Sequence, residues 1–280
     1  MMIRIFSPVD SFNSNPANIS QNQTTSSHSF KLDSGDHPHF SWIQNLGNFE
    51  GVAYTYWDGE KLSNTDGTAY SPVASPEINT PIIIAKCPRN EKKYYNFPTL
   101  LLDSNGNPNI TWKIMEEFEN NFSNSLCYLK WDGLNWTTFS DESVTTKNYD
   151  NTKFFSPDSM IYDYRFVLSK AEKPVFLIDG SNKNLKYLRY NDSIWMSVDG
   201  QKINLEIDSE SRIFKTLEDQ NISSVSTNLD DDGIPHIFFQ KYIPGNGYEK
   251  DRIELYYQKW NDKFPRKNGL PFCRELVKVD

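Results

Sequence analysis

The residues of this chain that could bind a metal or transfer a proton are its four histidines and its acidic stretches. Asp103–Asn107 and Asp230–Gly233 look like fragments of calcium loops. A calcium loop of the EF-hand type, however, needs about twelve residues that end in a bidentate glutamate, and it lies between two helices. His28 and His37 have no cysteine or carboxylate at the spacing of a zinc site. We therefore expect hairpin turns at both stretches, and neither a metal nor a cofactor.

The other two histidines each directly follow a proline. They are His39 and His236, and two other parts of the chain carry Asn109 and Val175 at the corresponding position. Because the position recurs along the chain, we expect these histidines to have a structural role rather than a catalytic one.

Acidic side chains are the remaining candidates for chemistry, because hydrolysis of a glycosidic bond requires two carboxylates that flank the bond. The candidates are Glu116, Glu117, Glu119, Asp141 and Glu142. Charge in a loop is usually a solvated surface, and the sequence predicts no catalytic residue among them.

The elements that carry these residues are clearest between Phe97 and Phe139. Four short apolar runs are separated there by turn residues and by a polar loop near Glu116–Asn124, a pattern typical of antiparallel strands. Asp103–Gly106 suits a tight hairpin, because Asp and Asn bond nearby backbone and Gly accepts a positive φ.

The same unit occurs four times along the chain, and we call these occurrences copies one to four. Each copy has the spacing Leu-x5-Pro and, further on, two aromatic residues three positions apart. A unit of four short strands cannot bury both of its faces alone, so the copies must stack. The residues that define the repeat are Asp33, Pro38, Trp57, Asp103, Gly106, Pro108, Trp131, Pro174, Tyr190, Asp230, Gly233, Pro235 and Trp260.

The wording LD-x-x-G-x-P followed by Y-x-x-W-D-G-x-x-W resembles the blades of bacterial and phage-type β-propeller repeat proteins of the sialidase-like and lectin-like kinds. The resemblance runs from Ser29 to the C-terminus. It implies an all-β fold, namely a β-propeller of about four four-stranded blades. A fifth blade is possible if the insertion at Pro81–Tyr95 forms one. That insertion is expected to contain an extra strand. The fold implies little about chemistry, because one propeller scaffold carries many functions.

Two departures from the sialidase pattern argue against that activity. The arginines of this chain form no recurring cluster. The aspartate and glycine of the sialidase repeat are separated by one residue, and among the aspartates that begin the turns of the copies only Asp33, with Gly35, has this spacing. The recurring aromatic residues, such as Trp131, could stack on sugar rings. Since every copy has an aromatic residue at that position, we expect them to pack in the core instead.

Composition restricts the function classes further. A net charge of −8 without a basic cluster argues against nucleic acid as a partner. Cys87, Cys127 and Cys273 are odd in number and lack metal-ligand spacing, which favours buried free thiols over a disulfide.

Residues 1–28 are expected to form a short strand and a polar arm, and residues 29–280 the propeller. The apolar run Ile3–Phe6 is too short for a signal peptide, and no later segment approaches a membrane span. We expect synthesis in the cytoplasm and no membrane contact. Ser11–Ser29 is rich in Asn, Gln, Ser and Thr and cannot form a core, so contact with other protein subunits would order it.

From these observations we expect a non-enzymatic propeller that acts as a binding or assembly module. It is either a glycan-binding, lectin-like module or a structural component of a larger particle such as a phage virion or tail. A glycoside hydrolase of the sialidase-like type is the alternative.

Removal of metal ions should leave the stability of the protein unchanged. Backbone geometry explains the Asp/Gly turns, whereas a bound metal would stabilise the folded state by mass action. We expect thermal unfolding with and without a chelator to give melting temperatures within about two degrees of each other. A chelator-sensitive melt would contradict the absence of a metal.

Overall fold

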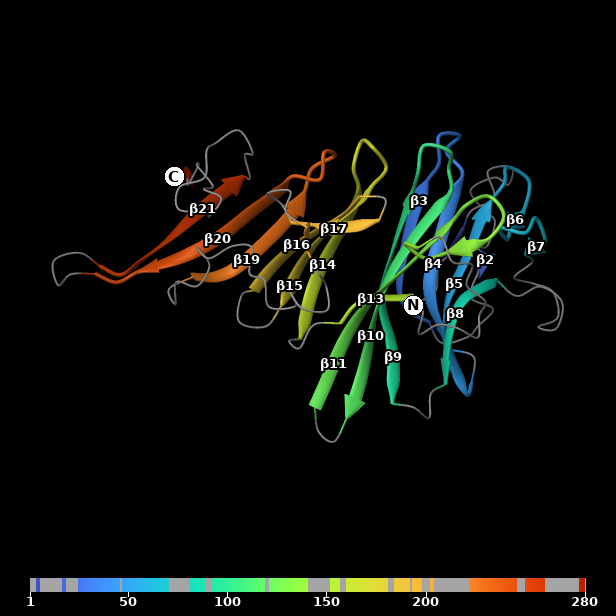
Figure 1. Cartoon of the computed structure of the whole chain (residues 1–280), viewed down its shortest axis with the longest axis horizontal. Helices are drawn as coiled ribbons and strands as arrows, with labels where there is room; N and C mark the ends of the chain where they lie inside the picture. The colour runs from blue at the N-terminus through green and yellow to red at the C-terminus, as the bar shows by residue number, and fades with distance from the viewer. Residues whose placement is uncertain are drawn as a thin grey trace. The chain divides into compact units, whose positions relative to one another are not determined.

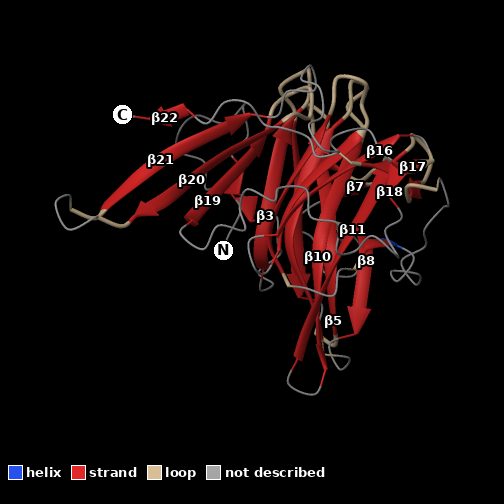
Figure 2. Cartoon of the chain, turned by 60° about the vertical axis from the view of Figure 1, so that its left-hand side comes forward, coloured by secondary structure: helices blue, strands red, loops and turns tan. Residues whose placement is uncertain are grey.

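The computed structural model describes residues 4–5, 17–18, 25–45, 47–70, 81–88, 92–118, 121–140, 152–156, 160–180, 184–191, 193–197, 202–203, 222–245, 250–259 and 277–279. Strands joined by turns make up nearly all of these residues (Figure 2), and no α-helix occurs among them. The prediction of an all-β fold is confirmed. The chain divides into two compact units, residues 1–156 and 157–280, which we describe separately.

The first unit contains two large antiparallel sheets that each follow the chain in order (Figure 1), besides a small N-terminal sheet. The first sheet consists of β3 (Thr25–Leu32), β4 (Pro38–Asn45), β5 (Phe49–Trp57), β6 (Leu62–Ser63) and β7 (Ala69–Tyr70), with β8 (Ile82–Pro88) paired to β5. The second sheet consists of β9 (Lys93–Leu102), β10 (Pro108–Phe118), β11 (Asn121–Trp131) and β12 (Trp136–Thr137), with β13 (Lys153–Phe155) paired to β11. The extra strand expected in the insertion is therefore β8.

The second unit also contains two antiparallel sheets in chain order. The third sheet consists of β14 (Ile161–Leu168), β15 (Pro174–Gly180), β16 (Asn184–Asn191), β17 (Ile194–Met196) and β18 (Lys202–Ile203). The fourth sheet consists of β19 (Ile222–Leu229), β20 (Pro235–Ile243), β21 (Arg252–Lys259) and β22 (Val277–Val279).

Each sheet corresponds to one copy of the repeat, so four antiparallel sheets are found where four were expected. The polar stretch Glu116–Asn124 differs from expectation, because β10 and β11 pair as far as Phe118↔Asn121. Backbone pairing between β10 and β11 thus continues through polar residues that the sequence pattern predicted to form a loop. Among the described residues no strand pairing joins these sheets into a closed structure, so the propeller remains a prediction.

The hairpin between the first two strands of each sheet has one common construction. The leucine and proline of the Leu-x5-Pro spacing are register partners in every copy: Leu32↔Pro38, Leu102↔Pro108, Leu168↔Pro174 and Leu229↔Pro235. In every turn the first side chain accepts the backbone N–H four residues later. The donor and acceptor pairs are His37 to Asp33 (2.9 Å), Asn107 to Asp103 (2.8 Å), Lys173 to Ser169 (3.2 Å) and Ile234 to Asp230 (2.9 Å).

This construction places one residue of each turn in the left-handed region. Gly106 (φ 80°) and Gly233 (φ 74°) occupy that position in copies two and four, whereas Asp36 (φ 60°) and Glu172 (φ 58°) occupy it in copies one and three. Gly35 is therefore not the residue that the backbone of the first turn requires. Copy three, with serine in place of aspartate, forms the same turn.

Neighbouring sheets within each unit share a core. In the first unit the largest cluster includes Tyr54, Trp112 and Leu129 from both sheets, and Trp131 packs against it while remaining partly exposed. In the second unit Val175, Leu177 and Tyr187 of the third sheet cluster with Ile237 and Phe239 of the fourth. Cys87 and Cys127 are buried and are not joined in a disulfide. Cys273 lies outside the described residues.

The N-terminal segment contains a small sheet of its own, in which β1 (Arg4–Ile5) pairs with β2 (Ala17–Asn18). The first sheet begins at Thr25, so the last residues of the segment expected to be an arm belong to a strand. A role of the remaining segment in assembly stays a prediction.

Gly106→Ala and Gly233→Ala should destabilise the protein unequally. Both substitutions place a side chain at a positive φ, which costs about 1 kcal/mol or more. A Cβ at residue 106 would meet nothing within 4 Å, whereas at residue 233 it would lie 2.9 Å from Val175 Cγ2. Urea unfolding should therefore show a clearly larger loss for Gly233→Ala, and equal losses would contradict this account of the turn.

Candidate active site

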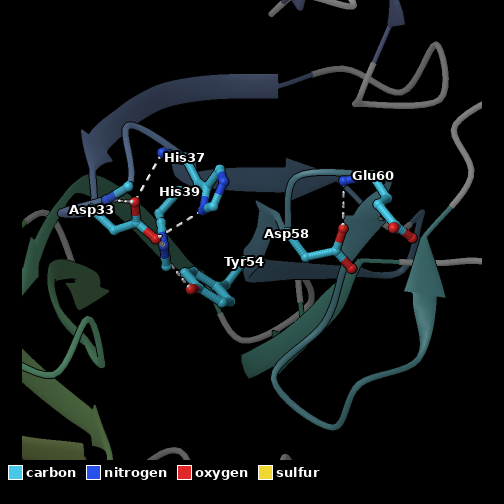
Figure 3. A network of polar contacts seen from close by, with 7 residues as sticks. Asp33, His37, His39, Tyr54, Asp58 and Glu60 are labelled. Atoms are coloured by element: carbon cyan, nitrogen blue, oxygen red, sulfur yellow. Dashed lines mark hydrogen bonds and ion pairs between the residues drawn. The ribbon is translucent and has the colours of Figure 1, made fainter.

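Asp33, in the turn between β3 and β4, is the centre of a polar network in the first unit (Figure 3). Its Oδ1 accepts the backbone N–H groups of Gly35 (2.8 Å) and His37 (2.9 Å). Desolvation raises the pKa of the Asp33 carboxyl, but the bonds from these two N–H groups, together with His37, outweigh it and lower the pKa below its usual value. Asp33 is therefore a fixed anion at neutral pH.

Two histidines approach the other oxygen of this carboxylate. His37 Nδ1 lies 3.3 Å from Asp33 Oδ2, and His39 Nε2 lies 3.7 Å from the same oxygen. The His37 side chain is 40% exposed, whereas that of His39 is 6% exposed. Asp33 thus stands between one accessible imidazole and one buried imidazole.

Two glycines leave room for the accessible imidazole. A Cβ on Gly35 would lie 3.1 Å from His37 Cε1, and a Cβ on Gly59 would lie 3.3 Å from His37 Nε2. Gly59 also has a φ of 100°, so the turn after β5 requires glycine in any case. Gly35 has no such backbone requirement, and its small size has its clearest effect on the position of His37.

The buried imidazole is held from behind by a tyrosine of β5. His39 Nδ1 and the Tyr54 hydroxyl are 2.6 Å apart, and the Tyr54 side chain belongs to the core of the first unit. Burial raises the pKa of Tyr54 well above its usual value and lowers the pKa of His39, although Asp33 offsets part of the shift at His39. Tyr54 is therefore protonated and His39 neutral at pH 7.

These charge states assign the protons of the network. The Tyr54 hydroxyl donates to His39 Nδ1, which places the proton of neutral His39 on Nε2, facing Asp33. Asp33 is anionic and has its Oδ2 beside His37 Nδ1, so His37 carries its proton on Nδ1. In the neutral form of His37 this arrangement leaves the lone pair on Nε2, where it can accept a proton.

The next turn at this end of the sheet supplies two more acidic residues (Figure 3). Asp58 Oδ1 accepts the N–H groups of Glu60 and Lys61, and Asp58 Oδ2 accepts the Ser63 hydroxyl at 2.7 Å. Both oxygens of Asp58 are thus occupied in stabilising the turn, while Glu60 is exposed.

Tyr56 completes this end of the sheet. Its ring stacks on His39 with the ring centroids 5.1 Å apart, and the side chain is partly exposed. Burial, and then the charge of Asp58, raise the pKa of Tyr56. The phenol is therefore protonated at neutral pH and can act as a proton donor.

The other copies show how much of this network belongs to the repeat. In copy four Asp230 Oδ2 lies 3.1 Å from His236 Nε2, and His236 Nδ1 lies 2.7 Å from the Tyr257 hydroxyl. In copy two the Tyr128 hydroxyl donates to Asn109 Oδ1 at 2.6 Å. An aspartate, a polar residue after the proline and a tyrosine are thus structural parts of the repeat, as expected for His39 and His236.

His37 is the residue that sequence reasoning missed. The corresponding residues of the other copies are Asn107, Lys173 and Ile234. A histidine four positions after the turn aspartate therefore occurs in copy one alone, beside the unusual Gly35, and this difference between copies is the signal that could have found it.

The residues predicted to define the repeat lie in corresponding places, and only some of them reach the site. Asp33 is the centre of the network, and Pro38 begins the strand that carries His39. Trp57 packs against a separate cluster that contains Phe40 and Trp42. In the hairpins of the other sheets lie Asp103, Gly106, Pro108, Pro174, Asp230, Gly233 and Pro235. Trp131 and Tyr190 are partly buried next to Trp136 and Trp195, and Trp260 lies outside the described residues.

No group of three or more His, Cys, Asp or Glu side chains that could hold a metal occurs within the described part of the chain. Within the same residues, no helix is long and apolar enough to cross a membrane.

Solved structures with a similar fold include enzymes that act on polysaccharides. A polysaccharide lyase, the PL25 ulvan lyase, is 8% identical over 88% of this chain and 54% of its own, with a TM-score of 0.55. The same values hold for that lyase bound to -[GlcA(1-4)Rha3S]-. The polysaccharide lyase Uly1 gives a TM-score of 0.41 at 12% identity, over 89% of this chain and 50% of its own. This chain thus spans about half the length of the ulvan lyase.

No protein-family model matches the sequence, and no curated protein matches it. The similarity to the ulvan lyase therefore concerns the fold. It nevertheless overturns the expectation of a non-enzymatic binding or assembly module, because the similar structures are carbohydrate-processing enzymes. A role as a virion or structural protein has no support.

Replacement of His39 should show how much its hydrogen bond to Tyr54 contributes to the free energy of unfolding. His39→Val, which copies Val175, leaves the buried Tyr54 hydroxyl without an acceptor and should cost about 1 to 3 kcal/mol. His39→Asn, which copies Asn109, preserves an acceptor and should cost distinctly less. Urea unfolding of both variants provides the measurement, and equal losses would show that the bond to Tyr54 contributes nothing.

Proposed function

We propose that this chain is the β-propeller region of an enzyme that cleaves an acidic polysaccharide, with His37 and Asp33 as its acid–base pair. The observation that carries the proposal is the dyad itself. The partly exposed imidazole of His37 has its Nδ1 3.3 Å from the Asp33 carboxylate, which fixes the proton on Nδ1. Two glycines leave the space that the imidazole occupies. The fold similarity to a polysaccharide lyase supports the class of substrate.

The propeller is part of this proposal. Four sheets of the same strand order begin with the same turn, and neighbouring sheets within each unit bury a shared core. These are the properties of adjacent blades. The four sheets would then be blades of one propeller, to which further chain could add others.

The reaction that suits an imidazole base is elimination. In a uronate, the carboxyl group makes the C5 proton acidic, so His37 Nε2 can remove it. The electron pair forms a C4–C5 double bond while the C4–O bond breaks, and the departing oxygen takes a proton. Tyr56 is the proposed donor, because its partly exposed ring stacks on His39 at the same end of the sheet and its phenol is protonated at neutral pH.

Hydrolysis fits the site less well. A glycoside hydrolase of the usual kind needs two carboxylates that are free to act. Asp58 is committed to its turn and to Ser63, and Asp33 to its turn and to His37. Hydrolysis is therefore the alternative outcome of the test.

The test is incubation of the purified protein with uronate-containing and neutral polysaccharides. Two products are measured separately: the ultraviolet absorbance of the unsaturated uronate and the number of new reducing ends. We expect both to rise with an acidic polysaccharide. New reducing ends without absorbance would replace elimination by hydrolysis, and no cleavage of any polysaccharide would reject the proposed function.

His37→Gln should lower kcat about a hundredfold or more, because general base catalysis is typically worth that much. Gly35→Ala should also lower kcat, because its Cβ would crowd both His37 (3.1 Å) and Asp33 Oδ1 (3.3 Å). His28→Gln is the matched control, since His28 is an exposed histidine of β3 outside the network. Unchanged kcat in both His37→Gln and Gly35→Ala would show that this dyad is not the catalytic pair.

A further inference from the structure

Copy three breaks the polar pattern of the repeat at one tyrosine. In the other copies the tyrosine of the third strand is hydrogen-bonded to the residue after the proline: Tyr54 to His39, Tyr128 to Asn109 and Tyr257 to His236. In copy three this tyrosine is Tyr187 and the residue after the proline is Val175. Tyr187 is 4% exposed, and its hydroxyl has no hydrogen bond within the described part of the chain.

An arginine lies on the same face of β16, two residues further along. Arg189 is partly exposed, and within the described residues it makes neither a hydrogen bond nor an ion pair. Its counterpart in copy four, Lys259, pairs with Asp230 at 3.4 Å. The serine at position 169 replaces the aspartate that a copy would otherwise provide, so the first turn of copy three has no carboxylate to pair with these two donors.

The one carboxylate that influences Tyr187 from the neighbouring sheet is already committed. Asp230 Oδ1 accepts the N–H groups of Asp232 and Ile234, and Asp230 Oδ2 lies 3.1 Å from His236 Nε2 and 3.4 Å from Lys259 Nζ. Burial, and to a lesser extent Asp230, raise the pKa of Tyr187 to about 12, although Arg189 acts in the opposite direction. Tyr187 therefore keeps its proton and remains a donor at neutral pH.

We propose that Tyr187 and Arg189 form a binding site for the anionic group, a carboxylate or a sulfate, of an acidic sugar. A guanidinium and a hydroxyl side by side suit two oxygens of such a group, since charge-assisted hydrogen bonds to Arg are strong and directional. The choice of an acidic sugar rests on the proposed function, whereas the need for an anion rests on these two donors.

The test is an NMR titration of the full chain with three probes: sodium glucuronate, sodium sulfate and, as the neutral control, glucose. We expect saturable shifts of Tyr187 and its neighbours with glucuronate or sulfate and none with glucose. Binding of sulfate without glucuronate would assign the site to a sulfated sugar. Equal binding of glucose, or no binding of either anion, would overturn the site.

Variants connect the binding to these residues. Arg189→Gln should weaken anion binding about tenfold or more, and Tyr187→Phe should weaken it less, because only the guanidinium carries charge. Arg165→Gln is the matched control, since Arg165 is a partly exposed arginine of the same sheet that already pairs with Asp163 at 2.7 Å. Undiminished binding by Arg189→Gln would overturn the proposal.

Different experimental results would contradict the proposed anion site and the proposed enzymatic function. If the chain cleaves an acidic polysaccharide but Arg189→Gln binds glucuronate and sulfate as the unmodified protein does, the anion site is wrong and the enzyme remains. If anion binding depends on Arg189 but no polysaccharide is cleaved, the anion site remains and the enzyme is wrong.

Discussion

The fold and the site both depend on one interaction, the bond from a side-chain oxygen at the start of each first turn to the backbone N–H four residues later. Asp33, Asp103, Ser169 and Asp230 each make it. It closes the hairpin at the Leu↔Pro pair and so fixes the register of the second strand. Because side chains alternate along a strand, that register decides which residue stands diagonally across from the tyrosine of the third strand.

The same turn therefore places different polar groups around the tyrosine of the third strand in different copies. In copies two and four the polar groups around the tyrosine satisfy one another, and the arrangement is structural. In copy one a second histidine, His37, extends the network to the surface and is the base of the proposed reaction. In copy three the acceptor is lost, and Tyr187 and Arg189 are left as donors. Both proposed sites lie at copies that depart from the repeat.

The comparison of copies also explains why the functional prediction from the sequence was wrong. Features that recur, such as Asp33 and His39, were interpreted as structural, and that reasoning drew attention away from His37, which does not recur. His37 has no ligand spacing in the sequence, since its partner is a carboxylate brought to 3.3 Å by the turn. The similarity to a polysaccharide lyase likewise became visible only in three dimensions, at 8% identity.

The sequence by itself determined the strands, the four sheets and the first turn of each. These depend on local pattern, on residues that bond their own backbone and on a spacing that recurs. Only the tertiary structure decided that Asp36 rather than Gly35 takes the left-handed conformation, that Gly35 makes room for an imidazole, and that Asp33 lies between two histidines. These residues lie within seven positions of one another, but their spacing specifies neither the φ angles of the turn nor the directions of the side chains. Both also depend on contacts with Gly59 and Tyr54 of a neighbouring turn and strand.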